Sequence, residues 1–291
     1  MAEQLPTTGQ LENAQNIVLV AARHTQEHNA PVTNLVEHHR LPPGAKQLTV
    51  PKVGQMTADD LSPGIDMVAS EDIGMTTVDL TVGEVGMLVV LDDTLVVQAN
   101  DPLVAVVGVQ MGNGMARKEN RDLIALFSAL NGGTTLGADN IDFSGRNAAA
   151  CIAFSMAQKF PMPVFVVHHP NTIFHLTSTL APIGATAGVQ TPVGFSADLL
   201  KNFWQVNLSG IPFFQTGDID LIGATGSAFG VIASMHALAV LDSMEPRVEP
   251  QRNASLRATE LNMVARYGVF ELDDTYGAPL RYEAGAPSTS N

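Results

Sequence analysis

Two short stretches of alternating apolar and polar residues flank a long polar excursion, and this arrangement constrains the fold most. Leu48 and Val50 alternate with polar neighbours in the first stretch, as do Val78 and Leu80 in the second, which predicts two strands. Residues 53–76 between them are rich in Asp, Ser, Pro and Gly and can bury little apolar surface. We expect a protruding two-stranded ribbon or long loop. Because an isolated ribbon is only marginally stable in water, something outside this chain should hold it.

Charge is distributed unevenly along the chain. Between Lys52 and Arg117 there is no Lys or Arg but there are ten acidic residues, which contribute −10 to a net charge of −14. The simpler interpretation is a solvated acidic face. The alternative is a surface that docks on basic groups of a neighbouring subunit. A calcium site is a weaker hypothesis, because the spacing is not that of an EF-hand loop.

Composition limits the classes of function. Charged residues make up 15% of the 291 residues and apolar residues 45%. This is too apolar for a disordered chain and low in charge for a monomer whose surface is wholly solvated. We therefore expect partners to cover part of the surface. The negative charge repels phosphate backbones and argues against sequence-specific binding of nucleic acid.

Cysteine usage and hydropathy indicate the compartment. Cys151 is the only cysteine, which excludes an intrachain disulfide and any multi-cysteine metal site. No apolar stretch is long enough to predict a membrane-spanning helix. The N-terminal residues lack the basic and apolar regions of a signal peptide. We expect a cytosolic product that does not enter a membrane.

One long helix has clear start and stop signals. Asn100 and Asp101 stand before Pro102, as is typical of a capped helix start, and the Asn-Gly-Gly at residues 131–133 is typical of a helix end. We predict a helix over about residues 101–131. Its second half should expose the charged residues Arg117, Lys118, Glu119, Arg121 and Asp122.

The second half of the chain alternates helices and short strands. Ser144 should cap a helix over residues 146–160, and the apolar run 164–167 is typical of a strand buried on both faces. The remaining expectations are helices at 170–180 and 197–207, a strand at 210–214, a helix or buried strand at 228–241, a Pro-flanked linker at 246–250, a strand at 259–272 and a frayed tail at 284–291.

One motif raises the possibility of an enzyme. His24, Glu27 and His28 match the H-x-x-E-H pattern of a class of zinc proteases, in which a helix presents two imidazoles and a general base. The pattern is short, arises often by chance and lacks a third ligand. The simpler interpretation is the polar face of a helix over residues 16–28, with His38 and His39 likewise solvated.

Other positions for chemistry are weaker. His168 and His169 follow a predicted strand, where catalytic or metal-binding groups converge in α/β sites. The simpler interpretation is that one faces the core and bonds to backbone while the other lies on the surface. Cys151 lies among alanines and should be a small buried apolar residue. No complete nucleotide-binding motif or G-x-S-x-G elbow occurs, so we expect no catalytic residue, cofactor or metal.

The order of these elements, more than any motif, resembles a known family. The phrases that carry the resemblance are PVFVVHHP at 163–170, LSGIPF at 208–213 and ARYGV at 265–269. With the polar arm, the acidic ribbon and the long helix, they resemble the major capsid proteins of tailed bacteriophages. These have the Hong Kong 97-type fold, an α+β fold, and the resemblance covers nearly the whole chain.

The resemblance implies a division of the chain. Residues 1–39 would be an N-terminal arm and residues 44–85 an extended β-ribbon loop. The peripheral domain would comprise 86–141, with the spine helix at about 101–131, and 242–291, in which 259–282 returns to complete its sheet. Residues 142–241 would form the axial domain.

The resemblance also implies a function. The protein would be no enzyme but would assemble with copies of itself, as hexamers and pentamers, into an icosahedral shell around a double-stranded DNA genome, which it would enclose without sequence-specific binding. Portal, scaffolding and decoration proteins would be its other partners, and the protein would be made in the host cytoplasm and reside in the virion. An encapsulin-type nanocompartment shell is the alternative within the same fold.

The charge map adds one hypothesis at the level of residues. We expect acids of one subunit's ribbon to approach basic residues on the long helix of the next subunit. The acids are Asp59, Asp60, Glu71 and Asp72, and the basic residues are Arg117, Lys118 and Arg121.

Overall fold

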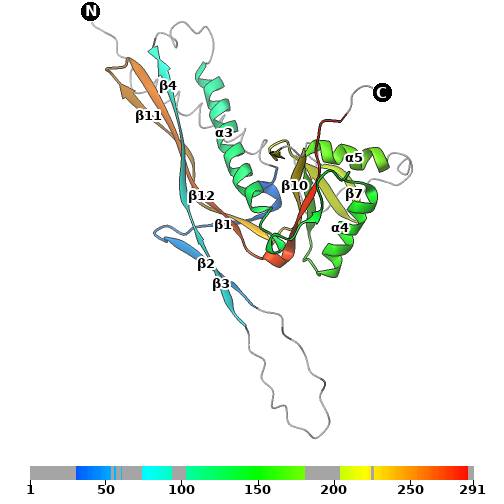
Figure 1. Cartoon of the computed structure of the whole chain (residues 1–291). Coiled ribbons are helices and arrows are strands. Elements are labelled where there is room, and N and C mark those ends of the chain that lie inside the picture. The colour runs from blue at the N-terminus through cyan, green and yellow to red at the C-terminus, as the bar shows by residue number, and fades with distance from the viewer. Residues whose placement is uncertain are drawn as a thin grey trace, which may run out of the picture.

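The computed structural model describes residues 31–53, 56, 60, 74–93, 103–180, 204–223 and 226–287. They form a four-stranded sheet, a seven-stranded sheet and a separate two-stranded sheet. The long helix α3 (Leu103–Leu126) lies along the four-stranded sheet and reaches the seven-stranded sheet with its C-terminal end (Figure 1). Within these ranges no helix has the length and apolar character needed to cross a membrane.

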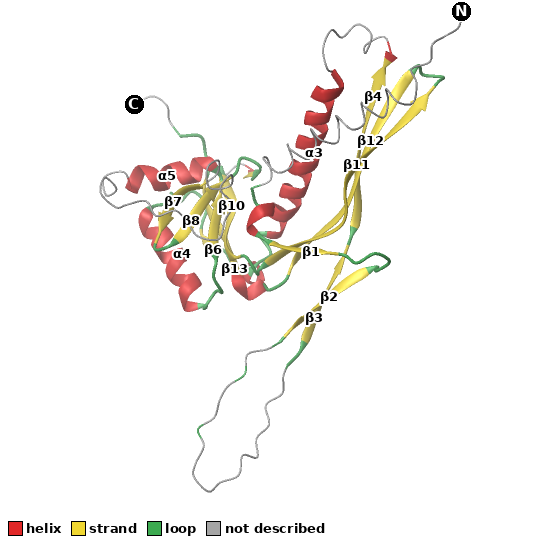
Figure 2. Ribbon diagram, turned by 180° about the vertical axis from the view of Figure 1, so that it is seen from behind, coloured by secondary structure: helices red, strands yellow, loops and turns green. Residues whose placement is uncertain are grey.

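The four-stranded sheet is long and narrow and has the strand order β1-β11-β12-β4 (Figure 2). Strand β1 runs parallel to β11, and the other pairs are antiparallel. Helix α3 covers one face, where Met111 and Met115 pack against Leu261 and Met263. The strands are β1 (Glu37–Arg40), β4 (Gly83–Asp92), β11 (Leu238–Asn253) and β12 (Ala258–Glu271).

Helix α3 ends earlier than the Asn-Gly-Gly signal predicts. After Leu126 the chain continues in turns, in which the Phe127 amide donates to the carbonyl of Ile124 over 3.0 Å. Hydrogen bonds to the third preceding residue tighten the last turn in this way at many helix ends. The predicted stop signal forms a separate 3-10 turn, η2 (Asn131–Gly133).

The linker predicted at residues 246–250 is wrong, because both of its prolines lie inside β11. Strand β11 pairs with β12 along its whole length, with register shifts between Asp242 and Arg247. Strand β1 covers the opposite edge of β11 only as far as Asp242. Beyond that point β11 is an edge strand in the part of the chain that the structure describes, and an edge tolerates proline because its outer amides have no ladder partner.

The seven-stranded sheet has the order β5-β13-β10-β6-β8-β7, with β9 paired to the end of β10. Helices α4 (Gly145–Ala157) and α5 (Pro170–Leu180) cover it. The strands are β5 (Leu136–Gly137), β6 (Val164–His168), β7 (Trp204–Leu208), β8 (Ile211–Gln215), β9 (Leu221–Ile222), β10 (Ser227–Ser234) and β13 (Gly277–Glu283). The predicted cap is present: Ser144 Oγ accepts from the Asn147 amide.

Strand β6 is buried on both faces, as its apolar run predicts. Val164 and Val166 face the cluster that contains α4 and α5. Phe165 and Val167 face a second cluster, to which the last turns of α3 contribute Leu123 and the turn after it contributes Phe127. The seven-stranded sheet is therefore the middle layer of this half of the molecule.

The helix predicted at residues 197–207 is wrong where the structure describes it. Residues 204–208 form β7, which pairs with β8 in an antiparallel hairpin. The two residues of the turn, Ser209 and Gly210, have φ of 52° and 84°, the left-handed conformation that a two-residue hairpin loop requires. The Ser-Gly pair is the signal for this hairpin. Residues 197–203 lie outside the described residues.

The return of residues 259–282 to a single sheet is also partly wrong. Strand β12 completes the four-stranded sheet, but after the 3-10 turn η4 (Asp274–Tyr276) strand β13 pairs with β10 in the seven-stranded sheet. Conversely, Leu238 begins β11 in the four-stranded sheet. The chain therefore passes from the seven-stranded to the four-stranded sheet at the tight turn before Leu238. It returns to the seven-stranded sheet at η4.

The last part of the predicted arm is built into the body. Val32, Leu35 and Val36 are fully buried around the 3-10 turn η1 (Thr33–Leu35). Residues 1–30, which include the predicted helix and His24, Glu27 and His28, lie outside the described residues. At the other end Ala284 is buried and its amide donates to the Gly226 carbonyl over 2.8 Å, so the predicted fraying does not begin there.

Candidate assembly interface

The ribbon predicted from the alternating stretches is present at its base. Strands β2 (Gln47–Lys52) and β3 (Thr76–Thr81) pair in antiparallel register, with Lys52 opposite Thr76. They project beyond one end of the four-stranded sheet (Figure 2). The two strands extend away from the rest of the body, so their outer part presents both faces to other molecules.

The apolar face of this base is anchored on the chain's own body. Leu80 is fully buried in a cluster with Leu41 and Leu241, and Leu48 and Val50 pack against it. On the polar side, Thr49 Oγ1 donates to Asp79 Oδ1 over 2.6 Å. The expectation that something outside this chain holds the ribbon therefore does not apply to its base, which this chain's own core holds.

Beyond the base the ribbon exposes apolar side chains. Val53, Met56 and Met75 are 52%, 58% and 63% exposed. Their position on one projecting element makes them candidates for contact with another molecule. Asp60 is also exposed, whereas the other three acids of the charge hypothesis, Asp59, Glu71 and Asp72, lie outside the described residues.

The three basic residues of that hypothesis lie together on the exposed side of α3. Lys118 pairs with Asp122 one helical turn on, and Arg121 Nη2 lies 3.4 Å from Asp220 Oδ1. Arg117 is exposed and has no partner in the described ranges. No ion pair within those ranges joins Asp60 to any of the three, so the guanidinium of Arg117 is the cation that remains available to another subunit.

The opposite side of this turn carries buried polar residues that the sequence interpretation missed. Glu119, predicted to be exposed, is only 5% exposed, and Asn120 is fully buried. Asn120 Oδ1 accepts from the Val32 amide over 3.2 Å, and its Nδ2 donates to Asp218 Oδ2 over 2.5 Å. The side-chain amide of Asn120 thus joins three segments: the arm junction (residues 31–36), α3 and the loop after β8. In the sequence Asn120 is a polar residue between the charged residues Glu119 and Arg121, so nothing there indicates that it is buried.

The histidine pair follows the simpler interpretation. His168 is fully buried, and its Nδ1 accepts from the His169 amide over 2.8 Å. Burial, with a smaller contribution from nearby His169, lowers the pKa of His168 to about 3, so the ring is neutral at physiological pH. His169 is partly exposed.

Cys151 also behaves as predicted. It is buried on α4, with its Sγ 3.6 Å from the Tyr282 hydroxyl. Burial raises the pKa of the thiol, which makes it a poor nucleophile. Among the described residues there is no group of three or more His, Cys, Asp or Glu side chains placed to hold a metal ion.

Comparisons of the fold place it among viral and compartment shells. The capsid of cyanophage P-SCSP1u matches with a TM-score of 0.63 at 15% identity, covering 87% of this chain and 88% of that one. The capsid of cyanophage Pam1 matches with a TM-score of 0.65 at 10% identity, covering 88% and 90%. An encapsulin complex from Synechococcus elongatus PCC 7942 gives 0.61 at 13% identity, covering 87% and 88%. The α+β fold that the resemblance implied is confirmed.

The sequence itself identifies the family. A search of curated proteins found no match. The family model described as phage capsid protein, however, matches residues 75–278, from the base of the ribbon through α3 and both large sheets. Since this match covers more than half of its length, the chain belongs to the phage capsid protein family and is a structural capsid protein.

Proposed function

We propose that this protein assembles as hexamers and pentamers into an icosahedral shell around the double-stranded DNA genome of a tailed phage. Membership of the phage capsid protein family supports a structural rather than an enzymatic role. The observation that carries the proposal is the β2–β3 ribbon, which projects from the body and exposes Val53, Met56 and Met75. A lone monomer gains nothing from such an element, whereas a shell subunit can lay it on a neighbour.

The division into domains follows the two large sheets. The four-stranded sheet with α3 would form the peripheral domain and the seven-stranded sheet with α4 and α5 the axial domain, which would meet its copies at capsomer centres. Strands β5 and β13 go with the axial sheet and residues 238–241 with the peripheral one, because that is where they pair. Residues 32–39 of the predicted arm at 1–39 and the base of the ribbon at 44–85 belong to the body. The arm before Val32 and the outer part of the ribbon would therefore reach neighbouring subunits.

We assign the contact between subunits to the acidic ribbon and the basic side of α3. Asp59, Asp60, Glu71 and Asp72 of one subunit would approach Arg117, Lys118 and Arg121 of the next. Within the described ranges Lys118 and Arg121 have partners in their own chain, so Arg117 would contribute most. Each exposed pair is worth about 0.2–1 kcal/mol, and repetition over many copies multiplies the effect.

The net charge of −14 suits a wall that encloses DNA without binding it tightly. Such a surface repels packaged phosphate backbones and allows the genome to leave. The chain would be made in the host cytoplasm and enter the virion together with portal, scaffolding and decoration proteins. The structural likeness to an encapsulin makes a cargo-filled compartment the second candidate.

Electron microscopy of the purified full-length chain, expressed alone, tests the proposal. We expect closed or partly closed particles with five- and six-coordinated capsomers. Particles isolated from infected cells should contain nuclease-protected DNA, whereas a protein cargo and no DNA would favour the compartment. A chain that stays monomeric at high concentration, and in the presence of its neighbouring gene products, would contradict a shell of either kind.

A further inference from the structure

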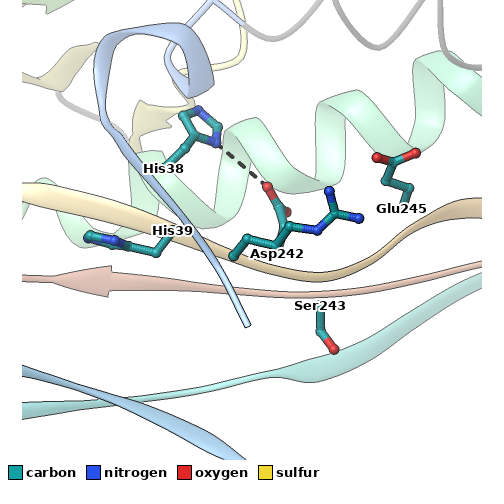
Figure 3. A pocket seen from close by; sticks show the side chains of 6 residues that line it. His38, His39, Asp242, Ser243 and Glu245 are labelled. Atoms are coloured by element: carbon teal, nitrogen blue, oxygen red, sulfur yellow. Dashed lines mark ion pairs between the residues drawn. The ribbon is translucent and has the colours of Figure 1, made fainter. Parts of the chain in front are cut away.

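Strand β1 joins the arm junction to the ribbon and is bordered by a small polar cavity. The cavity has a volume of about 170 Å³ and lies where β1 meets the irregular part of β11 (Figure 3). Its lining is His38, His39, Arg40, Asp242, Ser243 and Glu245. Bulges commonly re-aim side chains at such places, and here β1 brings two imidazoles up to the carboxylates of β11.

The imidazole of His38 is held between two acceptors. Its Nε2 lies 2.7 Å from the carbonyl oxygen of Thr33 in η1, and its Nδ1 lies 3.6 Å from Asp242 Oδ2 in β11. Figure 3 shows the ring directed at this carboxylate. A neutral imidazole has one N–H and can satisfy only one acceptor, whereas an imidazolium donates from both nitrogens. The geometry therefore fits the protonated ring.

The other charged groups around His38 act in both directions. Glu119 on α3 adds negative charge that favours the protonated ring. Glu245 on β11 and Arg40 on β1 line the same cavity and carry opposite charges. Glu37 lies between two more imidazoles: its Oε1 is 3.5 Å from His39 Nε2 and its Oε2 is 3.2 Å from His236 Nδ1. The contact of Glu37 with His236 ties β1 to the turn before β11, whereas Glu37 and His39 both belong to β1.

We propose that β1 is a pH-dependent clasp, in which protonated His38 ties η1 and β11 together through Thr33 and Asp242. Loss of the proton leaves two acceptors facing one donor and weakens the attachment of β1 to β11. The close carboxylate of Asp242 raises the pKa of His38 against the opposing effect of burial, and Thr33 and Glu119 add to the rise. A raised pKa means that the clasp is intact below the ordinary value of 6.5 and is lost as pH rises through the raised value.

The clasp acts on the element proposed to contact neighbours. Leu41 follows β1 directly, packs against Leu80 at the base of the ribbon, and donates its amide to the Asp242 carbonyl over 2.8 Å. Loosening β1 therefore loosens the base from which the ribbon projects. This consequence for a shell rests on the proposed function, whereas the clasp itself does not.

Hydrogen exchange of the full-length chain tests the clasp directly. Protection factors, which correct for base-catalysed exchange, are measured by mass spectrometry for a peptide spanning β1 and Leu41 at pH 6 and pH 8.5. The His38 side chain is 44% exposed, so its pair with Asp242 is worth no more than an exposed ion pair. We therefore expect protection to fall about two- to fivefold. Peptides from β12 should change much less.

Two variants separate the clasp from general loosening. Asp242→Asn should remove most of the pH dependence of protection in β1. The control is Asp142→Asn, which alters a comparable pair at 3.6 Å between Asp142, before α4, and His175 Nδ1 on α5. This control should leave the pH dependence of β1 unchanged. An Asp242→Asn profile that matches the unmodified chain would overturn the proposal.

A second measurement needs no variant. Exchange of the histidine C2 proton, followed by mass spectrometry, gives the pKa of His38 in the full chain whether or not it assembles. We expect a pKa above 6.5, and a value at or below 6.5 would overturn the clasp. Shell formation is scored separately by electron microscopy, so failure of the clasp and failure of the proposed function give different results.

Discussion

The ammonium of Lys52 lies 2.7 Å from Asp273 Oδ2 and joins the outer end of β2 to the turn that follows β12. The carboxylate side chain is only 7% exposed, whereas the lysine is 42% exposed. Burial alone would raise the pKa of Asp273, but hydrogen bonds from Lys52 and Thr275 outweigh it and leave the pKa below the usual value. This ion pair fixes the ribbon base to the body at a second point, beyond the apolar cluster around Leu80.

Replacing Lys52 with Met should lower the free energy of unfolding by about 1–2 kcal/mol, because a mostly buried carboxylate loses its cation. Urea unfolding at pH 7 measures the change. A lowered pKa stabilises the fold above the ordinary value of 3.8, and this contribution is lost as pH falls through the lowered value. The difference from the unmodified chain should therefore shrink in strong acid.

Arg247→Met provides the control for Lys52→Met. It breaks an ion pair with Glu249 in which both side chains are more than half exposed, and such pairs contribute only about 0–1 kcal/mol. Equal effects of the two substitutions would show that Lys52 is no more than a surface charge.

Gly230→Ala should destabilise the seven-stranded sheet. A Cβ at residue 230 would lie 2.3 Å from His168 Cδ2 and 2.5 Å from the carbonyl oxygen of Val167. Neither the buried ring nor the strand can yield without moving β6 against β10, so we expect a loss of about 1–3 kcal/mol. Thermal unfolding measures it. Gly217→Ala, where a Cβ meets nothing within 4 Å, should change stability by less than about 0.5 kcal/mol.

The buried His168 should make the fold sensitive to acid. Its pKa is about 3 in the folded chain and close to 6.5 when unfolded. Between these values only the unfolded state takes up the proton, so stability falls as pH drops below 6.5. Between pH 7 and pH 5 the loss should be about 2 kcal/mol. His168→Gln should show a correspondingly flatter profile in urea unfolding, and parallel profiles would contradict a neutral buried ring.

Local periodicity was enough to predict the elements whose signals lie within one segment. The alternation around Leu48 and Val78 predicted β2 and β3, and the run that starts at Val164 predicted a strand buried on both faces. The cap at Ser144 predicted the start of α4. In each of these cases the pattern and the final environment agree, because the residues that set the period are the residues that become buried.

What the sequence could not supply is which distant segments meet. Residues 246–250 look like a linker because of their prolines, but an exposed edge of β11 accommodates them. Nothing in the local sequence of β13 indicates that it pairs with β10 and not with the four-stranded sheet. The clasp is hidden for the same reason, since His38 and Asp242 meet only through the parallel pairing of β1 with β11.

Shortening the ribbon should abolish assembly and preserve the fold. Lys52 and Thr76 are paired across the ribbon, so replacing residues 53–75 with Asn-Gly should close the hairpin with a two-residue turn. We expect unchanged circular dichroism and thermal unfolding, together with loss of particles in electron microscopy. Particle yields equal to those of the full-length chain would remove the ribbon from the proposed contact.

Arg117 offers the sharpest test of the charge contact between subunits. It is exposed and has no ion-pair partner in the described ranges, unlike Lys118 and Arg121. Arg117→Glu should therefore leave the stability of the isolated chain within about 0.5 kcal/mol, yet reduce particle yield at physiological salt. Arg117→Lys keeps the charge and should assemble nearly normally.

Charge exchange identifies the partner of Arg117. Combining Arg117→Glu with Asp60→Lys should restore part of the particle yield if Asp60 of a neighbour faces Arg117. The same exchange to Lys tests the other acids of the ribbon, which are Asp59, Glu71 and Asp72. Sedimentation velocity gives the assembled fraction. Because exposed pairs are screened by salt, the defect of Arg117→Glu should be larger at low ionic strength. Equal assembly of Arg117→Glu and the unmodified chain at every salt concentration would contradict the contact.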